Sequence, residues 1–350
     1  MILRNIGKSI SVELLVQQII LFNRNFYSDL ILMKQELFPH IEPFETGLFK
    51  ASEIHNIYWE RSGKKAGEPI LILHGGPGGG SDPLYRRYFD PRKYEIIQFD
   101  QRGCGKSLPN CELRENTTID LIEDIEKLRN YLSINSWTIF GGSWGSTLGL
   151  IYSIKFRNKV KYLILRGVFL CRQSDINWFY QNGASCIFPE EFESFTEILN
   201  EKQKSNILRS YYDIFTSSDT LIKDKALKAW TRWEMSTSRL LIDRDYIKRS
   251  TDPLFYKAFS LIECHYFVNN IFMEDNYIIN NIKKLKDLKT YIVHGRYDVV
   301  CPISNAWTLH CCLPKSQLYI VPDAGHSIQE SGIIDNLINI TNMLEYDKYK

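Results

Sequence analysis

The sequence lacks the features that would mark a nucleic-acid-binding, metal-binding or membrane-spanning protein. Its 43 basic and 41 acidic residues leave a formal net charge of +2, so there is no electrostatic reason to expect nucleic acid as a partner. The eight cysteines show no paired C-x-x-C spacing, which argues against a zinc site or a dithiol redox site. Reduced thiols and a cytoplasmic location are the simplest expectation from this pattern.

Long apolar runs are also missing, including at the N-terminus. The apolar stretch there is interrupted by Glu13 and Gln17, stops at Asn23, and shows no clear small-residue cleavage site. The sequence therefore predicts neither a membrane span nor a secretory signal. Residues 1–36 are interpreted as an N-terminal extension, for which a docked amphipathic helix, an upstream addition and an organelle address are the alternatives.

The order of apolar and helix-like segments predicts an α/β fold with a mostly parallel central sheet and helices on both faces. Thr118 is expected to cap a helix that runs to about Leu132. From about residue 169 to 286 the strand rhythm stops, and helix-like segments such as residues 224–239 replace it. Strands are expected at residues 70–73, 94–99, 137–140, 161–165, 289–293 and 317–321.

The most informative motif is Gly141-Gly142-Ser143-Trp144-Gly145, which lies between an expected strand (137–140) and a helix-like stretch (146–156). This is a G-x-S-x-G nucleophile elbow in its strand-turn-helix context. A serine on so sharp a turn takes a strained backbone conformation, so Gly141 and Gly145 must be small. The motif predicts that the Ser143 hydroxyl stands exposed at the end of a strand.

A serine hydroxyl needs a base, an orienting acid and an oxyanion hole to act as a nucleophile. His326 follows an expected strand in a loop that would bring the imidazole over the serine, and it is the candidate base. Asp298 follows another expected strand and is the candidate acid that holds the imidazole tautomer. The chain order Ser143, Asp298, His326 is that of the α/β-hydrolases.

The oxyanion hole is expected to use two backbone N–H groups. One should come from Trp144, directly after the nucleophile, and the other from Gly76 in the glycine-rich loop of residues 74–80. This loop lacks the G-K-[ST] ending of a phosphate-binding P-loop, so a nucleotide site is not predicted.

Together these motifs resemble the proline iminopeptidases, or prolyl aminopeptidases, which are serine peptidases of the α/β-hydrolase fold. The resemblance runs from about residue 37 to near the C-terminus, and its most specific motifs lie in or beside the expected cap. The motifs are HGGPGGG (74–80), DQRGCGKS (100–107), GGSWGSTL (141–148), LRGVF (165–169), WFYQNGA (178–184), AWTRWE (229–234) and IECHYF (262–267).

The resemblance implies a serine exopeptidase that acts on peptides with a free N-terminal proline and needs no cofactor or metal. It implies that Glu234 and Glu263 bind the amino terminus of the substrate and that Arg166 supports them. Phe169, together with aromatic side chains near Phe179 and Tyr180, would form the proline pocket. The implied domains are a first core part (37–168), a helical cap (169–286) and a second core part (287–350).

The residues alone also allow other interpretations of the site and of the function. Glu234 and Glu263 could be ordinary carboxylates paired with Arg232 or Arg239. His294 is expected to be a packed or surface imidazole without a role in the chemistry. The alternatives for function are a broader aminopeptidase or esterase of the same fold and a hydrolase-like small-molecule binding protein, whereas epoxide hydrolases and dehalogenases carry Asp where this chain has serine.

Overall fold

The computed structural model describes residues 34–344 and divides the chain into two units, Met1–Lys34 and Gln35–Lys350. The predicted extension, residues 1–36, therefore lies almost entirely outside the described residues, and its role stays a prediction. The account that follows concerns the second unit.

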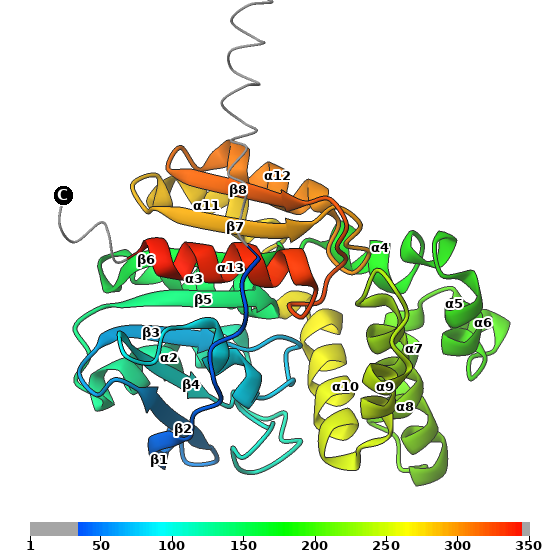
Figure 1. The fold of residues 1–350 in the computed structure, drawn as a ribbon. Helices are drawn as coiled ribbons and strands as arrows, with labels where there is room; N and C mark the ends of the chain where they lie inside the picture. Colours follow the sequence, from blue (N-terminus) through cyan, green and yellow to red (C-terminus); the bar gives the residue numbers. More distant parts are fainter. Residues whose placement is uncertain (1–33, 345–350) are drawn as a thin grey trace, which may run out of the picture. The chain divides into compact units, whose positions relative to one another are not determined.

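An eight-stranded sheet forms the centre of this unit, with the strand order β1-β2-β4-β3-β5-β6-β7-β8 (Figure 1). β2 pairs with its two neighbours in the antiparallel sense, and all the other pairs are parallel. The strands are β1 (Pro43–Lys50), β2 (Asn56–Gly63), β3 (Glu68–Leu73), β4 (Tyr94–Phe99), β5 (Trp137–Ser143), β6 (Val160–Val168), β7 (Thr290–Gly295) and β8 (Ser316–Val321). The predicted α/β-hydrolase architecture is confirmed.

Alternate residues of the central strands face two separate apolar layers, because successive side chains of a strand point to opposite faces. Ile70 and Ile72 of β3 pack on the face covered by η1 (Pro83–Tyr88) and α13 (Ser331–Met343). Leu71 and Leu73 pack on the other face, which α2 (Thr118–Tyr131), α3 (Trp144–Lys155) and α12 (Ile303–Cys312) cover. Both faces of the sheet are therefore buried.

All six predicted strands are present, and β4 has the predicted bounds. β1 and β2 were not predicted, because their alternating and partly exposed residues form no continuous apolar run. Thr118, which the sequence predicts to cap α2, is the first residue of this helix, and Thr117 is the N-cap instead. The Thr117 side chain accepts from the Asp120 N–H, and the Asp120 carboxylate accepts from the Thr117 N–H, which is a capping box.

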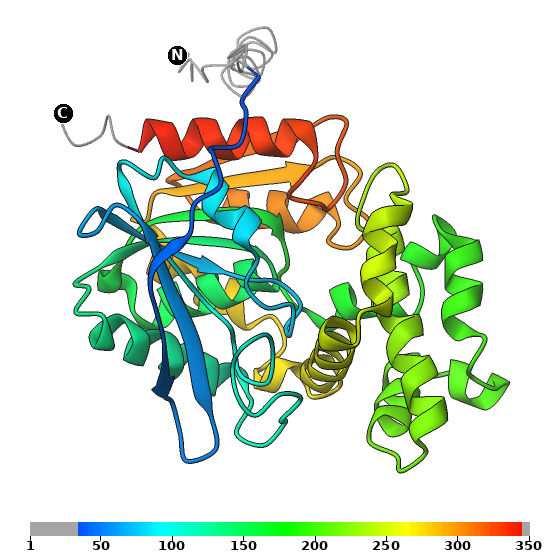
Figure 2. The same ribbon diagram turned by 60° about the horizontal axis from the view of Figure 1, so that its bottom comes forward.

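Helices and loops connect β6 to β7. The main helices are α4 (Gln173–Tyr180), α5 (Pro189–Thr196), α6 (Glu201–Lys204), α7 (Ile207–Phe215), α8 (Thr220–Thr237), α9 (Arg244–Ile247), α10 (Pro253–Val268) and α11 (Tyr277–Asn281). The short turns are η2 (Arg157–Lys159) before β6, then η3 (Ala184–Cys186), η4 (Lys248–Thr251), η5 (Asn270–Phe272) and η6 (Ile282–Leu285). The helices from α4 to α10 lie beside the carboxyl ends of the parallel strands, whereas α11 packs against α3 (Figure 2). We call the helices α4 to α10 the cap.

An aromatic core holds the cap helices together. Tyr180 of α4 stacks on Trp230 of α8 with ring centroids 4.4 Å apart, and Phe195 of α5 stacks on Trp233 at 5.7 Å. All four side chains are buried. In the part of the chain that the structure describes, no helix is both long and apolar enough to cross a membrane.

Candidate active site

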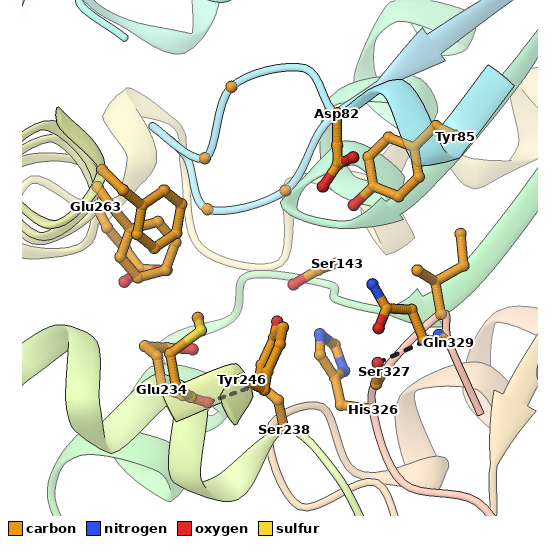
Figure 3. Close-up of a pocket in the computed structure, with 18 of the residues that line it drawn as sticks. Asp82, Tyr85, Ser143, Glu234, Ser238, Tyr246, Glu263, His326, Ser327 and Gln329 are labelled. Atoms are coloured by element: carbon orange, nitrogen blue, oxygen red, sulfur yellow. Dashed lines mark hydrogen bonds between the residues drawn. The ribbon is translucent and has the colours of Figure 1, made fainter. Parts of the chain in front are cut away.

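Ser143 is the last residue of β5 and has a left-handed backbone conformation, with φ +57° and ψ −127°. A Cβ atom on Gly141 would lie 2.2 Å from the Gly145 carbonyl oxygen, and one on Gly145 would lie 2.1 Å from that of Leu73. The prediction that both positions must be small is confirmed. The Ser143 side chain makes no capping hydrogen bond to α3, and its hydroxyl faces a cavity (Figure 3).

Asp298 and His326 form a buried pair at the ends of two neighbouring strands. His326 Nδ1 lies 2.8 Å from Asp298 Oδ2, and the other carboxylate oxygen accepts the Cys301 N–H at 2.8 Å. Burial raises the pKa of Asp298, but the contacts with His326, His294 and the Cys301 N–H outweigh it and leave this pKa below its usual value. His326 and Ser143 line the same cavity, with the imidazole ring turned toward the serine (Figure 3).

The backbone of His326 is held from both sides. Its N–H donates to the Ser238 carbonyl oxygen at the end of α8, which also accepts the Ser327 N–H, at 3.0 and 2.8 Å. Its own carbonyl oxygen accepts from Arg166 Nη1 at 2.7 Å. The cap and the sheet together therefore fix the position of this imidazole.

Gly167 is a site residue that the sequence analysis did not single out. It has φ +53°, and a Cβ atom there would lie 2.9 Å from His326 Cε1 and 3.0 Å from Nδ1. Only glycine combines this conformation with so close an approach. A glycine at the end of a parallel strand was the available signal, but it does not say what would fill the space.

The glycine-rich loop after β3 lies against the nucleophile. A Cβ atom on Gly75 would lie 3.5 Å from Ser143 Cβ, and Gly75 and Gly76 both line the cavity. His74 Nε2 accepts the Gln101 N–H, so its Nδ1–H donates to the Gly75 carbonyl oxygen at 2.9 Å. His74 therefore braces the loop.

Trp144 is the first residue of α3, where backbone N–H groups have no partner within the helix. Its indole is fully buried and donates to Gln101 Oε1 at 2.8 Å, which fixes the orientation of this turn. The N–H groups of Gly76 and Trp144 stay our predicted oxyanion donors.

The cavity beside Ser143 has a volume of about 110 Å³. This is small against the roughly 300–1,000 Å³ of pockets for drug-sized ligands, and it suits a ligand group of about one residue. Its wall combines the glycine loop, the candidate nucleophile and base, three carboxylates, an arginine, and other polar and apolar side chains: Gly75, Gly76, Gly79, Gly80, Asp82, Tyr85, Ser143, Arg166, Glu234, Met235, Ser238, Tyr246, Phe255, Phe259, Glu263, His326, Ser327, Ile328 and Gln329.

Glu234 of α8 and Glu263 of α10 face this cavity and are 6% and 3% exposed. The Tyr180 hydroxyl donates to Glu234 Oε1, and Trp230 Nε1 donates to Glu263 Oε2 at 2.7 Å. Burial raises the pKa of Glu234 to about 7, although the Tyr180 hydrogen bond opposes the shift. Burial and then the neighbouring Glu234 raise the pKa of Glu263 well above its usual value.

No Lys or Arg of the described residues forms an ion pair with either glutamate. The two arginines considered as partners are bound elsewhere, Arg232 to Glu191 and Arg239 to Asp243. Two buried carboxylates that share a cavity and have no ion-pair partner among the described residues are costly, and a ligand cation would relieve that cost.

The aromatic residues expected to form the proline pocket lie elsewhere. Phe169, Phe179 and Tyr180 are buried, but none of them lines the cavity. Tyr180 contributes through its hydrogen bond to Glu234. The aromatic side chains that line it are instead Tyr85 of η1, Tyr246 of α9, and Phe255 and Phe259 of α10, whose rings stack at 5.0 Å.

Arg166 lines the cavity, and its Nη1 donates to the His326 carbonyl oxygen rather than to a glutamate. A Cβ atom on Gly142 would lie 2.4 Å from its Nη2, so the guanidinium passes directly over the elbow. Its predicted support of the carboxylates stays a prediction. Within residues 34–344, no group of His, Cys, Asp and Glu side chains has the arrangement of a metal site.

Comparison with known proteins identifies a matching family model and close relatives by sequence. The family model described as the alpha/beta hydrolase fold matches residues 68–333. A protein named probable proline iminopeptidase, from Leptolyngbya boryana, is 50% identical over 309 residues, covering 88% of this chain and 96% of that one. The proline iminopeptidase of Arabidopsis thaliana is 48% identical over 307 residues, covering 87% and 81%.

Solved structures with low identity share the fold. A bromoperoxidase from Bacillus anthracis superposes with a TM-score of 0.61 at 15% identity, covering 87% of this chain and all of that one. An esterase from Exiguobacterium antarcticum gives a TM-score of 0.57 at 20% identity, with the same coverage. The fold is thus common to several hydrolytic and oxidative enzymes, whereas the sequence match is specific, and this chain belongs to the proline iminopeptidase family of the α/β-hydrolase fold.

Proposed function

We propose that this protein is a prolyl aminopeptidase, which hydrolyses the peptide bond after an N-terminal proline. One observation carries the proposal: Ser143 shares a cavity of about 110 Å³ with two buried carboxylates that have no basic partner among the described residues. A free amino terminus supplies the missing positive charge. An acylated amino terminus has no such charge and would need extra room.

The site recognises both ends of a single residue. Glu234 and Glu263 bind the secondary ammonium of proline, and the carbonyl of that residue lies at Ser143. The apolar ring contacts the wall formed by Phe255, Phe259 and neighbouring side chains. Since the cavity holds about one residue, the enzyme removes one residue at a time.

The chemistry proceeds through an acyl-enzyme. Ser143 Oγ attacks the proline carbonyl carbon while His326 Nε2 takes the hydroxyl proton, and Asp298 holds the imidazole through Nδ1. The N–H groups of Gly76 and Trp144 bind the oxyanion. His326 then gives its proton to the leaving amine as the C–N bond breaks. A water molecule, deprotonated by the same imidazole, attacks the ester and releases free proline. No step calls for a metal or cofactor.

The substrates are peptides with a free N-terminal proline, and the expected cytoplasmic location stays a prediction. The family alternatives are a broader aminopeptidase or esterase. The alternative outside catalysis is a binding protein that keeps the pocket without turnover.

The test compares chromogenic amides of free proline, N-acetyl proline and other free amino acids. The proposal expects rapid cleavage of the free proline amide and cleavage of the acylated compound that is slower by at least a hundredfold. Ser143→Ala and Asp298→Asn should each lower kcat by several orders of magnitude in folded protein. Efficient cleavage of N-acetyl proline amides would reject the aminopeptidase assignment, and binding without turnover by the wild type would favour the binding protein.

A further inference from the structure

His294 is a fully buried imidazole directly beside the acid of the proposed triad. It is the next-to-last residue of β7, and its Nε2 lies 2.7 Å from the Cys301 carbonyl oxygen and 3.3 Å from Asp298 Oδ2. Its other ring nitrogen, Nδ1, lies 3.1 Å from the Val168 backbone nitrogen. The sequence predicts only a packed or surface imidazole at His294, without a role in the chemistry.

The contact with Val168 fixes the tautomer of His294. A backbone N–H can only donate, so Nδ1 must accept and carries no proton. The proton of the neutral ring is therefore on Nε2, where it is donated to the Cys301 carbonyl oxygen and faces Asp298. Burial lowers the pKa of His294, although the Asp298 carboxylate opposes this, and the lowered pKa and the Val168 contact both favour the neutral ring.

The two partners of His294 belong to opposite sides of the active site. Val168 is the strand partner of Ser143 and directly follows Gly167, which touches the His326 ring. Cys301 ends the turn in which Asp298 is held, because its N–H donates to Asp298 Oδ1. One imidazole thus connects the end of the nucleophile's neighbouring strand with the turn that carries the acid.

We propose that His294 is a positioning residue, whose Nε2–H holds the Asp298 turn through the Cys301 carbonyl oxygen so that Asp298 Oδ2 stays on His326 Nδ1, while the Val168 N–H keeps the ring in the tautomer that carries this proton. The role rests on the proposed function, because it requires Asp298 to be the acid of the triad. His294 contacts no substrate and exchanges no proton in the reaction.

The neutral state of His294 is part of this role. A charged imidazolium beside Asp298 would compete with His326 for the carboxylate and weaken its support of the protonated base. The charged or titratable groups that act on His294 are Asp298, His326 and Arg166, and the last two disfavour a further positive charge. The Val168 N–H also blocks the nitrogen that would have to take the proton.

Three substitutions separate the contacts of His294. In His294→Gln, the side-chain amide nitrogen is as many bonds from Cβ as Nε2 is, so it keeps the donor to Cys301. In His294→Asn, the side-chain oxygen takes the place of Nδ1, so it keeps the acceptor for Val168 and loses the donor. His294→Phe removes both. His55→Phe is the matched control, because His55 is also fully buried and its Nε2 lies 2.8 Å from a carbonyl oxygen, that of Arg114, away from the cavity.

The readouts are kcat, KM and the pH profile of kcat/KM, measured on a small activated ester so that the glutamates do not contribute. We expect His294→Asn and His294→Phe to lower kcat about 10- to 100-fold, by analogy with residues that orient metal ligands, with little change in KM. The acid limb of the profile should move to lower pH, because a misplaced Asp298 supports the protonated His326 less. His294→Gln should recover most of kcat, and His55→Phe should lower only the melting temperature.

Comparison with Asp298→Asn separates this role from the proposed function. If His294 acts through Asp298, adding His294→Asn to Asp298→Asn should cause little further loss. Folded His294→Asn enzyme with normal kcat and an unchanged acid limb would overturn the role of His294, and so would a His294→Gln enzyme no better than His294→Asn. If His294→Phe fails to fold, the comparison of kcat between His294→Gln and His294→Asn still tests the role of His294. Normal turnover in Asp298→Asn would instead overturn the proposed triad and the role of His294 with it.

Discussion

Replacing Glu234 or Glu263 with Gln should separate amide and ester hydrolysis. Both carboxylates are more than nine-tenths buried, so a bound ammonium that loses one of them is left in a poorly solvated site. Losing one partner of such a buried pair typically costs about 2–5 kcal/mol, which corresponds to roughly a 30- to 5,000-fold loss of kcat/KM. A small activated acetate ester has no ammonium, so its hydrolysis should stay within a few-fold of the wild type.

The substitution Glu234→Gln should also stabilise the folded protein. The pKa of Glu234 is raised from an ordinary 4.5 to about 7, so the folded protein disfavours the charged carboxylate, and stability is lost as the pH rises through this interval. At pH 8, Glu234→Gln removes that penalty, which is on the order of 3 kcal/mol by linkage. The amide still accepts from the Tyr180 hydroxyl. A more stable and less active enzyme is therefore expected.

The assay follows a chromogenic proline amide and the ester at pH 8, with the melting temperature measured on the same samples. Glu191→Gln is the matched control, because Glu191 is a cap carboxylate that already has a cationic partner, Arg232. Its activity on both substrates should be unchanged. Equal losses on amide and ester would show that the glutamates support the fold or the triad, and the proposed ammonium site would be wrong.

Further experiments test other parts of the site. Pyrrolidine, a cyclic secondary ammonium, should inhibit competitively and bind more weakly as the pH falls below about 7, because Glu234 becomes protonated there; an inhibition constant that is constant from pH 5.5 to 8 would contradict this. Gly167→Ala should lower kcat at least tenfold, because the new Cβ atom displaces the His326 ring from Asp298, and it should cost about 1–2 kcal/mol of stability for the left-handed backbone. Turnover close to wild type in that variant would show that the ring has room to move. Deleting Met1–Lys34 should leave kcat for proline amides within a few-fold, and loss of soluble protein would instead mean that the segment packs on the core.

The sequence predicts those parts of the fold that short-range patterns determine. Apolar runs located six strands, and glycines around Ser143 located the elbow, since each is encoded within a few residues. The amphipathic, partly exposed β1 and β2 gave no comparable signal. The strained φ of Ser143 follows from the motif, whereas the fit of Gly167 against His326 depends on two distant loops.

Short-range sequence patterns do not predict which aromatic side chains line the cavity. Phe179 and Phe255 lie in similar aromatic, helix-like stretches, yet only Phe255 reaches the cavity, because the packing of α10 against α7, α8 and the glycine-rich loop decides which ring points inward. Likewise, the residues near His294 in the sequence do not predict that the Val168 N–H fixes the tautomer of its ring. Contacts between segments far apart in the chain carry these features.

The two hydrogen bonds that the Ser238 carbonyl accepts from the His326 loop limit how this enzyme can be re-engineered. The helix that carries Glu234 ends on the backbone of the proposed base, so specificity and reactivity share one structural element. A chimera that exchanges the cap for that of another hydrolase would remove this anchor together with the old pocket. New specificities are therefore more accessible by changing side chains on α10 and α9, with the last turn of α8 left in place, than by transplanting the cap as a module.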